Sequence, residues 1–144
     1  MKITDKLVQR LMIKWWVRLG LEDWRIQWQW NTQDEIEAEQ YNASAYTTRW
    51  ADERAAQIHI SSERKWEYPG TANLDDDLER VILHELTHVY FMPQDQPLHT
   101  ANDMVKNYLP KDVWKHHWDL LVASREGYVQ SFVELLLRQD RGKK

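Results

Sequence analysis

The stretch VILHELTHVY, residues 81–90, places His84, Glu85 and His88 in the spacing HExxH. Apolar residues recur at helical spacing through and just before this stretch, which predicts an amphipathic helix: Leu78, Ile82, Leu86 and Val89. Two histidines four residues apart advance by about 400° on a helix, so both rings project from nearly the same side and can chelate one cation. Glu85 lies about 100° further round, where its carboxylate can hydrogen-bond a metal-bound water without ligating the metal.

This arrangement has the chemistry of a hydrolytic zinc site. Zinc in an open site lowers the pKa of its water from about 15.7 towards 7. Glu85 can take that proton as hydroxide attacks a peptide carbonyl, and can return it to the leaving amine. The sequence has no cysteine, so histidine and carboxylate are the strong ligands available to Zn²⁺. We therefore expect His84 and His88 to bind zinc and Glu85 to act as the general base.

A catalytic zinc site needs a third protein ligand and leaves the fourth position to water. The longer pattern HExxHxxGxxH is excluded, because Phe91 and Gln94 stand at its glycine and histidine positions. On the last predicted helix Glu126 falls beside the apolar stripe, whereas Glu134 falls on the opposite side. A carboxylate near the core needs a partner, and zinc is a sufficient one. Other candidates for the third ligand remain, the last two being weaker: His116, His117, His99 and Asp103.

The segments before the motif predict helix and sheet. A helix is expected over residues 5–19, capped by Thr4 or Asp5 and ended by Gly20. Alternating apolar and polar residues predict a strand at 24–30, followed by an acidic loop at 31–39. Two further strands, at 41–50 and 55–61, are expected to form a hairpin-like pair in which His59 faces solvent rather than a metal.

The active-site helix is expected to begin near Asp75 or Asp76, and a last helix to cover about 112–139, where Gly127 could bend or break it. The whole is an α+β layout: an N-terminal helix, a short three-stranded and mostly antiparallel sheet, the active-site helix and a glutamate-bearing C-terminal helix. A basic stripe on the first helix is interpreted as a solvated face: Lys6, Arg10, Lys14 and Arg18.

Length and charge limit the class of protein. The 144 residues suffice for one domain, residues 1–144. The net charge of −4 argues against a general nucleic-acid binder. The apolar residues near the start are interrupted by charges, unlike a signal peptide, and no stretch approaches the length of a membrane span. A cytoplasmic protein without membrane partners is expected.

Several segments, taken in order, resemble the minimal gluzincin-type metallopeptidases, small HExxH proteins common in phages and prophages. The matching pieces are DWRIQW, AAQIHIS, LERVILHELTHVY and SREGYVQSFVELLL. The resemblance implies a zincin-like domain that cuts peptide or protein substrates, with His84, His88 and Glu126 as zinc ligands and Glu85 as the base. It also implies that the strand before the active-site helix, AAQIHIS, pairs with an extended substrate.

Some features leave alternatives open. Gluzincins stabilise the oxyanion with a tyrosine or histidine, and the candidates are Tyr128 and His117, then Tyr90, Tyr108 and His116. The segment HHWDLL also looks slightly like the SprT-like proteases, which act on DNA-associated proteins. A non-catalytic, zinc-stabilised regulatory or binding protein is a further alternative, although such a protein would not need Glu85.

Overall fold

The computed structural model describes residues 3–50, 52–70, 76–93, 100, 101, 103, 104 and 106–142. The chain divides into two compact units, Met1–Tyr90 and Phe91–Lys144. The first unit contains the sheet and three helices, and the second contains a short 3₁₀ helix, η2 (Lys106–Tyr108), and one long helix. The expected capping residue Asp75 and the candidate ligand His99 lie outside the described residues.

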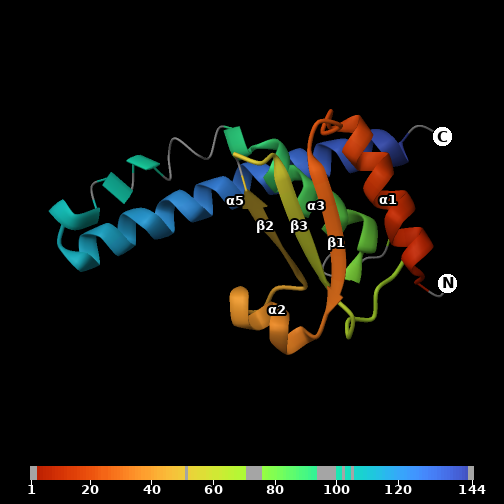
Figure 1. Ribbon diagram of the computed structural model, residues 1–144, viewed down its shortest axis with the longest axis horizontal. Coiled ribbons are helices and arrows are strands. Elements are labelled where there is room, and N and C mark those ends of the chain that lie inside the picture. Colours follow the sequence, from red (N-terminus) through yellow and green to blue (C-terminus); the bar gives the residue numbers. More distant parts are fainter. Residues whose placement is uncertain are drawn as a thin grey trace. The chain divides into compact units, whose positions relative to one another are not determined.

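The sheet has three strands, β1 (Arg25–Asn31), β2 (Ala45–Trp50) and β3 (Ala55–Ser61), in the order β1-β3-β2 (Figure 1). β2 and β3 are antiparallel, as expected of a hairpin. β1 and β3 are parallel, so the expectation of a mostly antiparallel sheet is wrong. Parallel strands need a crossover connection, and here the segment between β1 and β3 supplies it. β3 is consequently the central strand, with both of its edges paired, and cannot be the strand that pairs with a substrate.

The predicted acidic loop contains a helix, α2 (Gln33–Glu39). Thr32 accepts a hydrogen bond from the backbone of Glu35, and the Glu35 carboxylate accepts one from the backbone of Thr32. These reciprocal bonds form a capping box. Ile36 is fully buried and anchors the helix. The loop prediction was wrong because it weighed the acidic composition and overlooked the spacing T-x-x-E, which indicates a helix start.

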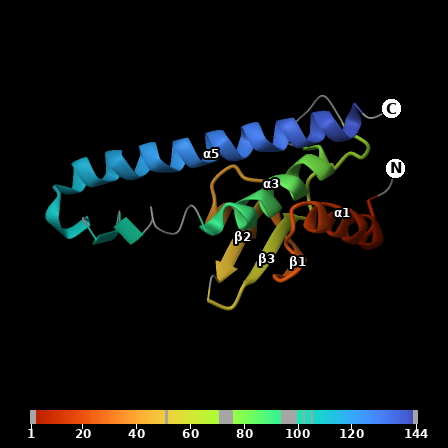
Figure 2. The same ribbon diagram turned by 90° about the horizontal axis from the view of Figure 1, so that it is seen from above.

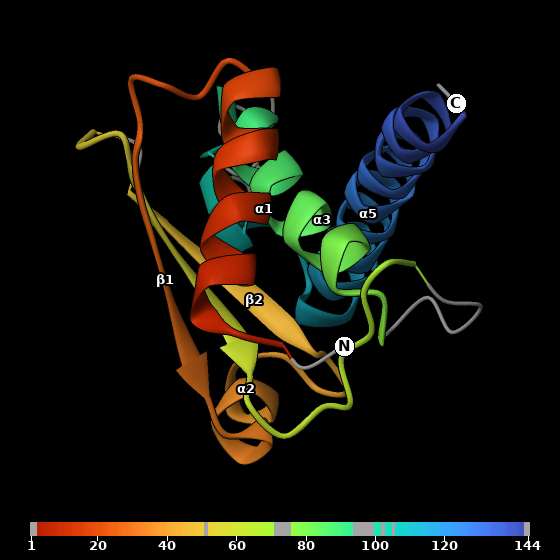
Figure 3. The same cartoon turned by 90° about the vertical axis from the view of Figure 1, so that its right-hand side faces the viewer.

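Two helices, α1 (Asp5–Arg18) and α3 (Leu78–Tyr90), cover one face of the sheet (Figure 3). α1 begins at the Thr4 cap and is followed by Gly20 at φ 69°, as expected. Along β3 the burial alternates, because every second side chain points at the helices. Large, fully buried apolar side chains come from all these layers, among them Leu11, Trp15, Ile58, Ile60, Ile82 and Leu86.

The basic stripe of α1 is only partly a solvated face. Lys14 Nζ lies 2.7 Å from Glu79 Oε1, which also accepts a hydrogen bond from Trp15 Nε1 at 2.8 Å. The Arg18 guanidinium lies 5.0 Å from the centroid of the Trp15 ring. Glu79 is buried, so Lys14 supplies the countercharge that a buried carboxylate requires. Lys6 and Arg10 are exposed, as the sequence predicts.

The second unit is dominated by α5 (Lys111–Arg141), which Figure 2 shows as one helix. Gly127 neither bends nor breaks it, contrary to the alternative considered for that position. Val129 and Val133 are fully buried. Phe91 packs edge-on against Tyr128 and Phe132, with ring centroids 4.9 and 5.2 Å apart. Among the described residues no helix is long and apolar enough to cross a membrane.

Candidate metal centre

α3 presents His84 and His88 as a pair. Their Nε2 atoms are 3.2 Å apart, and their rings meet at 76° with centroids 4.8 Å apart. Zinc–nitrogen bonds of about 2.0–2.1 Å at a tetrahedral angle would separate two ligand nitrogens by roughly 3.3 Å. Both side chains are half-buried, so they remain accessible to an ion. The two imidazoles therefore have the donor type and the separation that chelation of one zinc ion requires.

Glu85 is held by a neighbouring strand. Its carboxylate Oε2 accepts a hydrogen bond from the Thr47 hydroxyl at 2.6 Å, and the residue is only 6% exposed. In the part of the chain that the structure describes, no hydrogen bond to Oε1 of Glu85 is found. Thr47 thus holds one carboxylate oxygen of Glu85 in place and leaves the other without a hydrogen bond among the described residues.

A second hydrogen bond ties the same strand to the same helix. The Arg49 guanidinium donates to the backbone carbonyl of His88 at 2.8 Å. Thr47 and Arg49 are two residues apart on β2, so both side chains point to the face that carries α3. The turn of α3 that carries Glu85 and His88 is therefore attached to edge strand β2 at two points.

Neither Thr47 nor Arg49 is among the site residues predicted from the sequence. Alternation along β2 could have placed Thr47 and Arg49 on one face of the strand. Nothing local in the sequence, however, indicates that β2 is the edge strand lying against α3. The order of the strands in the sheet decides which side chain reaches Glu85.

Glu126 belongs to the second unit, on α5. Its side chain is 35% exposed, and its Oε1 lies 3.9 Å from the Arg125 guanidinium. Glu134, eight residues further along, accepts a hydrogen bond from Gln130 at 3.0 Å. Glu126 is thus a partly buried carboxylate on its helix, as expected from the helical phase.

The remaining candidates of the second unit differ in exposure. His116, His117 and Asp103 are exposed, and Tyr108 is 85% exposed. Tyr128 is half-buried and packs on Phe91. In the first unit, Tyr90 at the end of α3 is 38% exposed. Of the possible oxyanion donors on α5, Tyr128 is therefore better ordered by packing than His117.

His59 lies outside the HExxH helix and is half-buried rather than solvent-facing as predicted. Its ring stacks on Tyr46 with centroids 4.2 Å apart, and its Nδ1 lies 2.9 Å from Asn31 Oδ1. Burial lowers the pKa of His59, against the opposing effect of Glu39 and Glu35. The same burial raises the pKa of Tyr46.

Comparisons of the chain with descriptions of protein families, with curated proteins and with solved structures gave no match.

Proposed function

We propose that the protein is a zinc-dependent metallopeptidase in which Glu85 is the general base. The observation that carries this proposal is the geometry of α3: two imidazole Nε2 atoms 3.2 Å apart, next to a buried carboxylate oriented by Thr47. A purely structural zinc site would need the histidines only. An oriented carboxylate one residue after the first ligand is the additional group that hydrolysis requires.

We further propose Glu126 as the third ligand. In support of this ligand set, His84 and His88 are half-buried imidazoles and Glu126 is a half-buried carboxylate, so each offers a ligand atom of a type that binds zinc. Two imidazoles and a carboxylate suit zinc and leave the fourth position open. The exposure of His116 and His117 makes them poorer candidates.

The substrate proposed is an extended peptide. Zinc, when bound, supplies Lewis-acid chemistry, acidifying a water and polarising a carbonyl. Glu85 holds and transfers the proton, while Thr47 keeps its carboxylate in one orientation. β2 has one edge that is unpaired within the described sheet, and its side chains Thr47 and Arg49 already contact α3. A peptide added to that edge would lie beside the proposed base.

Elemental analysis of untagged protein tests the ligand set. We expect about one zinc ion per chain in the wild type and in Glu134→Ala, the matched control on the same helix. His84→Ala and Glu126→Ala should lose the metal. Retention in Glu126→Ala would remove that residue from the site, and absence of zinc from reconstituted wild type would overturn the proposed function.

Proteolysis of fluorescent casein by the Glu85→Gln variant tests the base. The amide cannot accept the proton, so hydrolysis should fall about 10²–10⁴-fold while zinc content stays unchanged. Thermal unfolding of both proteins controls for folding. Zinc-loaded wild type with no activity on casein or on denatured protein pools would favour the non-catalytic, zinc-stabilised alternative instead.

A further inference from the structure

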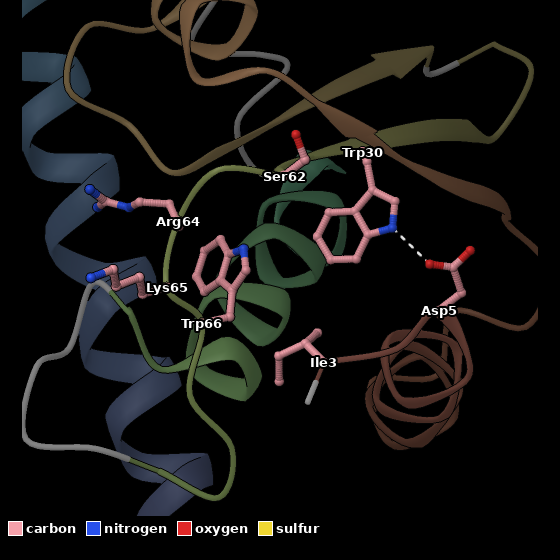
Figure 4. Close-up of a pocket in the computed structure, with 7 residues that line it drawn as sticks. All are labelled: Ile3, Asp5, Trp30, Ser62, Arg64, Lys65 and Trp66. Carbon is pink, nitrogen blue, oxygen red and sulfur yellow. Dashed lines mark hydrogen bonds between the residues drawn. The ribbon is translucent and has the colours of Figure 1, made fainter. Parts of the chain in front are cut away.

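A pocket of about 470 Å³ opens in the first unit, between the N-terminal end of α1, the C-terminal end of β1 and the segment after β3 (Figure 4). Small-molecule sites commonly have volumes of about 300–1,000 Å³. None of its lining residues belongs to the proposed zinc site, so ligand binding here would be independent of the proposed function. Its lining includes two indoles, a carboxylate and two basic side chains: Trp30, Trp66, Asp5, Arg64 and Lys65.

The two tryptophans offer ring faces rather than N–H groups. Trp30 Nε1 donates to Asp5 Oδ1 at 2.8 Å, and Trp66 Nε1 donates to the backbone carbonyl of Ser61 at 2.7 Å. Both indole donors are therefore already used inside the protein. What remains for a ligand is aromatic surface, chiefly that of the half-buried Trp30, because Trp66 is only 8% exposed. Such a surface favours a flat ring that can stack.

The two basic residues place positive charge at one end of the pocket, although Arg64 shares its charge with Asp76. The Nε atom of Arg64 is buried and has no hydrogen-bond partner within the described residues, although Asp76 Oδ1 lies 3.7 Å away. Lys65 is exposed, and within the described ranges it forms no ion pair. A buried, unsatisfied guanidinium donor beside a second cation favours a multivalent anion such as a phosphate.

The charges of the pocket are separated. In the view of Figure 4, Trp66 lies between Trp30 on one side and Arg64 and Lys65 on the other. The carboxylate among the lining residues, Asp5, is bound to Trp30. The anionic part of a ligand is therefore directed to the end with Arg64 and Lys65, and its ring to the end with Trp30.

We propose that this pocket binds a nucleoside monophosphate, with the base stacked on the Trp30 indole and the phosphate at Arg64 and Lys65. The ligand needs a flat ring, an anion and a spacer between them, and a nucleotide has all three. Stacking on an aromatic side chain and charge-assisted hydrogen bonds from arginine are the two interactions by which proteins commonly hold nucleotides.

Calorimetric titration of the full chain with AMP tests the proposal, with adenosine and inorganic phosphate titrated separately. We expect AMP to bind saturably and each fragment to bind at least about tenfold more weakly, because each keeps one of the two interactions. The indole N–H resonance of Trp30, assigned by its loss in Trp30→Leu, should shift with AMP. The indole N–H resonance of Trp50, which lies at the opposite end of the sheet, should not shift with AMP.

Variants separate the two ends of the pocket. Arg64→Gln/Lys65→Gln should weaken AMP binding about tenfold or more and leave adenosine binding unchanged. Trp30→Leu should weaken AMP and adenosine alike by about tenfold. Trp50→Leu and Arg10→Gln/Lys111→Gln, which remove the same groups elsewhere, are the matched controls and should bind as wild type.

Three results would overturn the proposal. One is the absence of saturable AMP binding by folded wild type. Another is unchanged affinity in Arg64→Gln/Lys65→Gln when its amide spectrum shows the native fold. The third is phosphotyrosine binding as tightly as AMP, which would assign the pocket to a phosphorylated aromatic side chain instead.

Discussion

Thr47 is the side chain on which the orientation of the proposed base depends. Its hydroxyl bond to Glu85 is 2.6 Å long, and the carboxylate has no second such contact among described residues. We expect Thr47→Val to lower kcat for casein hydrolysis on the order of tenfold with little change in KM, since a hydrogen bond to a charged group is lost. Thr47→Ser should restore kcat. Zinc content should stay the same in all three proteins, and equal kcat in the valine and serine variants would contradict the positioning role.

His59 gives the stability of the sheet a pH dependence. Burial holds the pKa of His59 below 6.5, so the unfolded chain binds the proton more readily than the folded one. The contribution of neutral His59 to the free energy of unfolding is fully present above pH 6.5. It is lost as the pH falls from 6.5 through the lowered pKa of the folded protein. We expect His59→Gln to flatten the free energy of unfolding over this window in urea titrations with EDTA present.

The exposed His117 supplies the control for that titration. His117→Gln, which removes an exposed histidine from the other unit, is the matched control variant. Glu35 titrates in a different pH range, because its hydrogen bonds to Thr32 and Asn31 lower its pKa. Its contribution to the free energy of unfolding is lost only at more acidic pH, as the pH falls through that lowered pKa. A profile unchanged by His59→Gln would show that His59 is equally protonated in folded and unfolded protein.

At the scale of elements, α5 contains Gly127 at a position whose helical backbone does not require a glycine. A Cβ at Gly127 would meet no heavy atom within 4 Å. Glycine inside a helix is less favourable than alanine, so Gly127→Ala should raise the free energy of unfolding by about 0.5–1 kcal/mol in urea titrations. Gly20→Ala is the contrasting change: its φ of 69° disfavours a side chain, and stability should fall. A lower free energy of unfolding in Gly127→Ala would contradict this prediction and would mean that the added methyl group meets a neighbouring atom or that the helix is bent at this position.

α2 shows how an element can be misjudged from composition. Its acidic residues suggested a loop, yet the same acidic residue at the third position, Glu35, closes the capping box with Thr32. Ile36 then buries its whole side chain. The cap and the apolar anchor add to a composition that itself suits a helix, because glutamate, glutamine and alanine are good helix formers and the acidic first turn complements the helix dipole.

For the whole molecule, bound zinc should contribute to stability by mass action. A ligand present at 1,000 times its Kd stabilises the folded state by about 4 kcal/mol. We expect EDTA to lower the Tm of wild type by several degrees and to leave the Tm of His84→Ala unchanged. Differential scanning calorimetry measures both. An EDTA effect of equal size in His84→Ala would place the stabilising metal away from the HExxH helix.

The sequence by itself determined the local features of this protein. The four-residue spacing of His84 and His88 fixes their relation on any helix, and the alternation along β3 fixes which side chains are buried, because both follow from backbone periodicity. The tertiary structure alone decided the order of the strands. Parallel pairing of β1 made β3 central and β2 the edge, and so brought Thr47 to Glu85 and Arg49 to His88. Such contacts join residues almost forty positions apart, where no local period reaches and only the packing of the elements selects the partner.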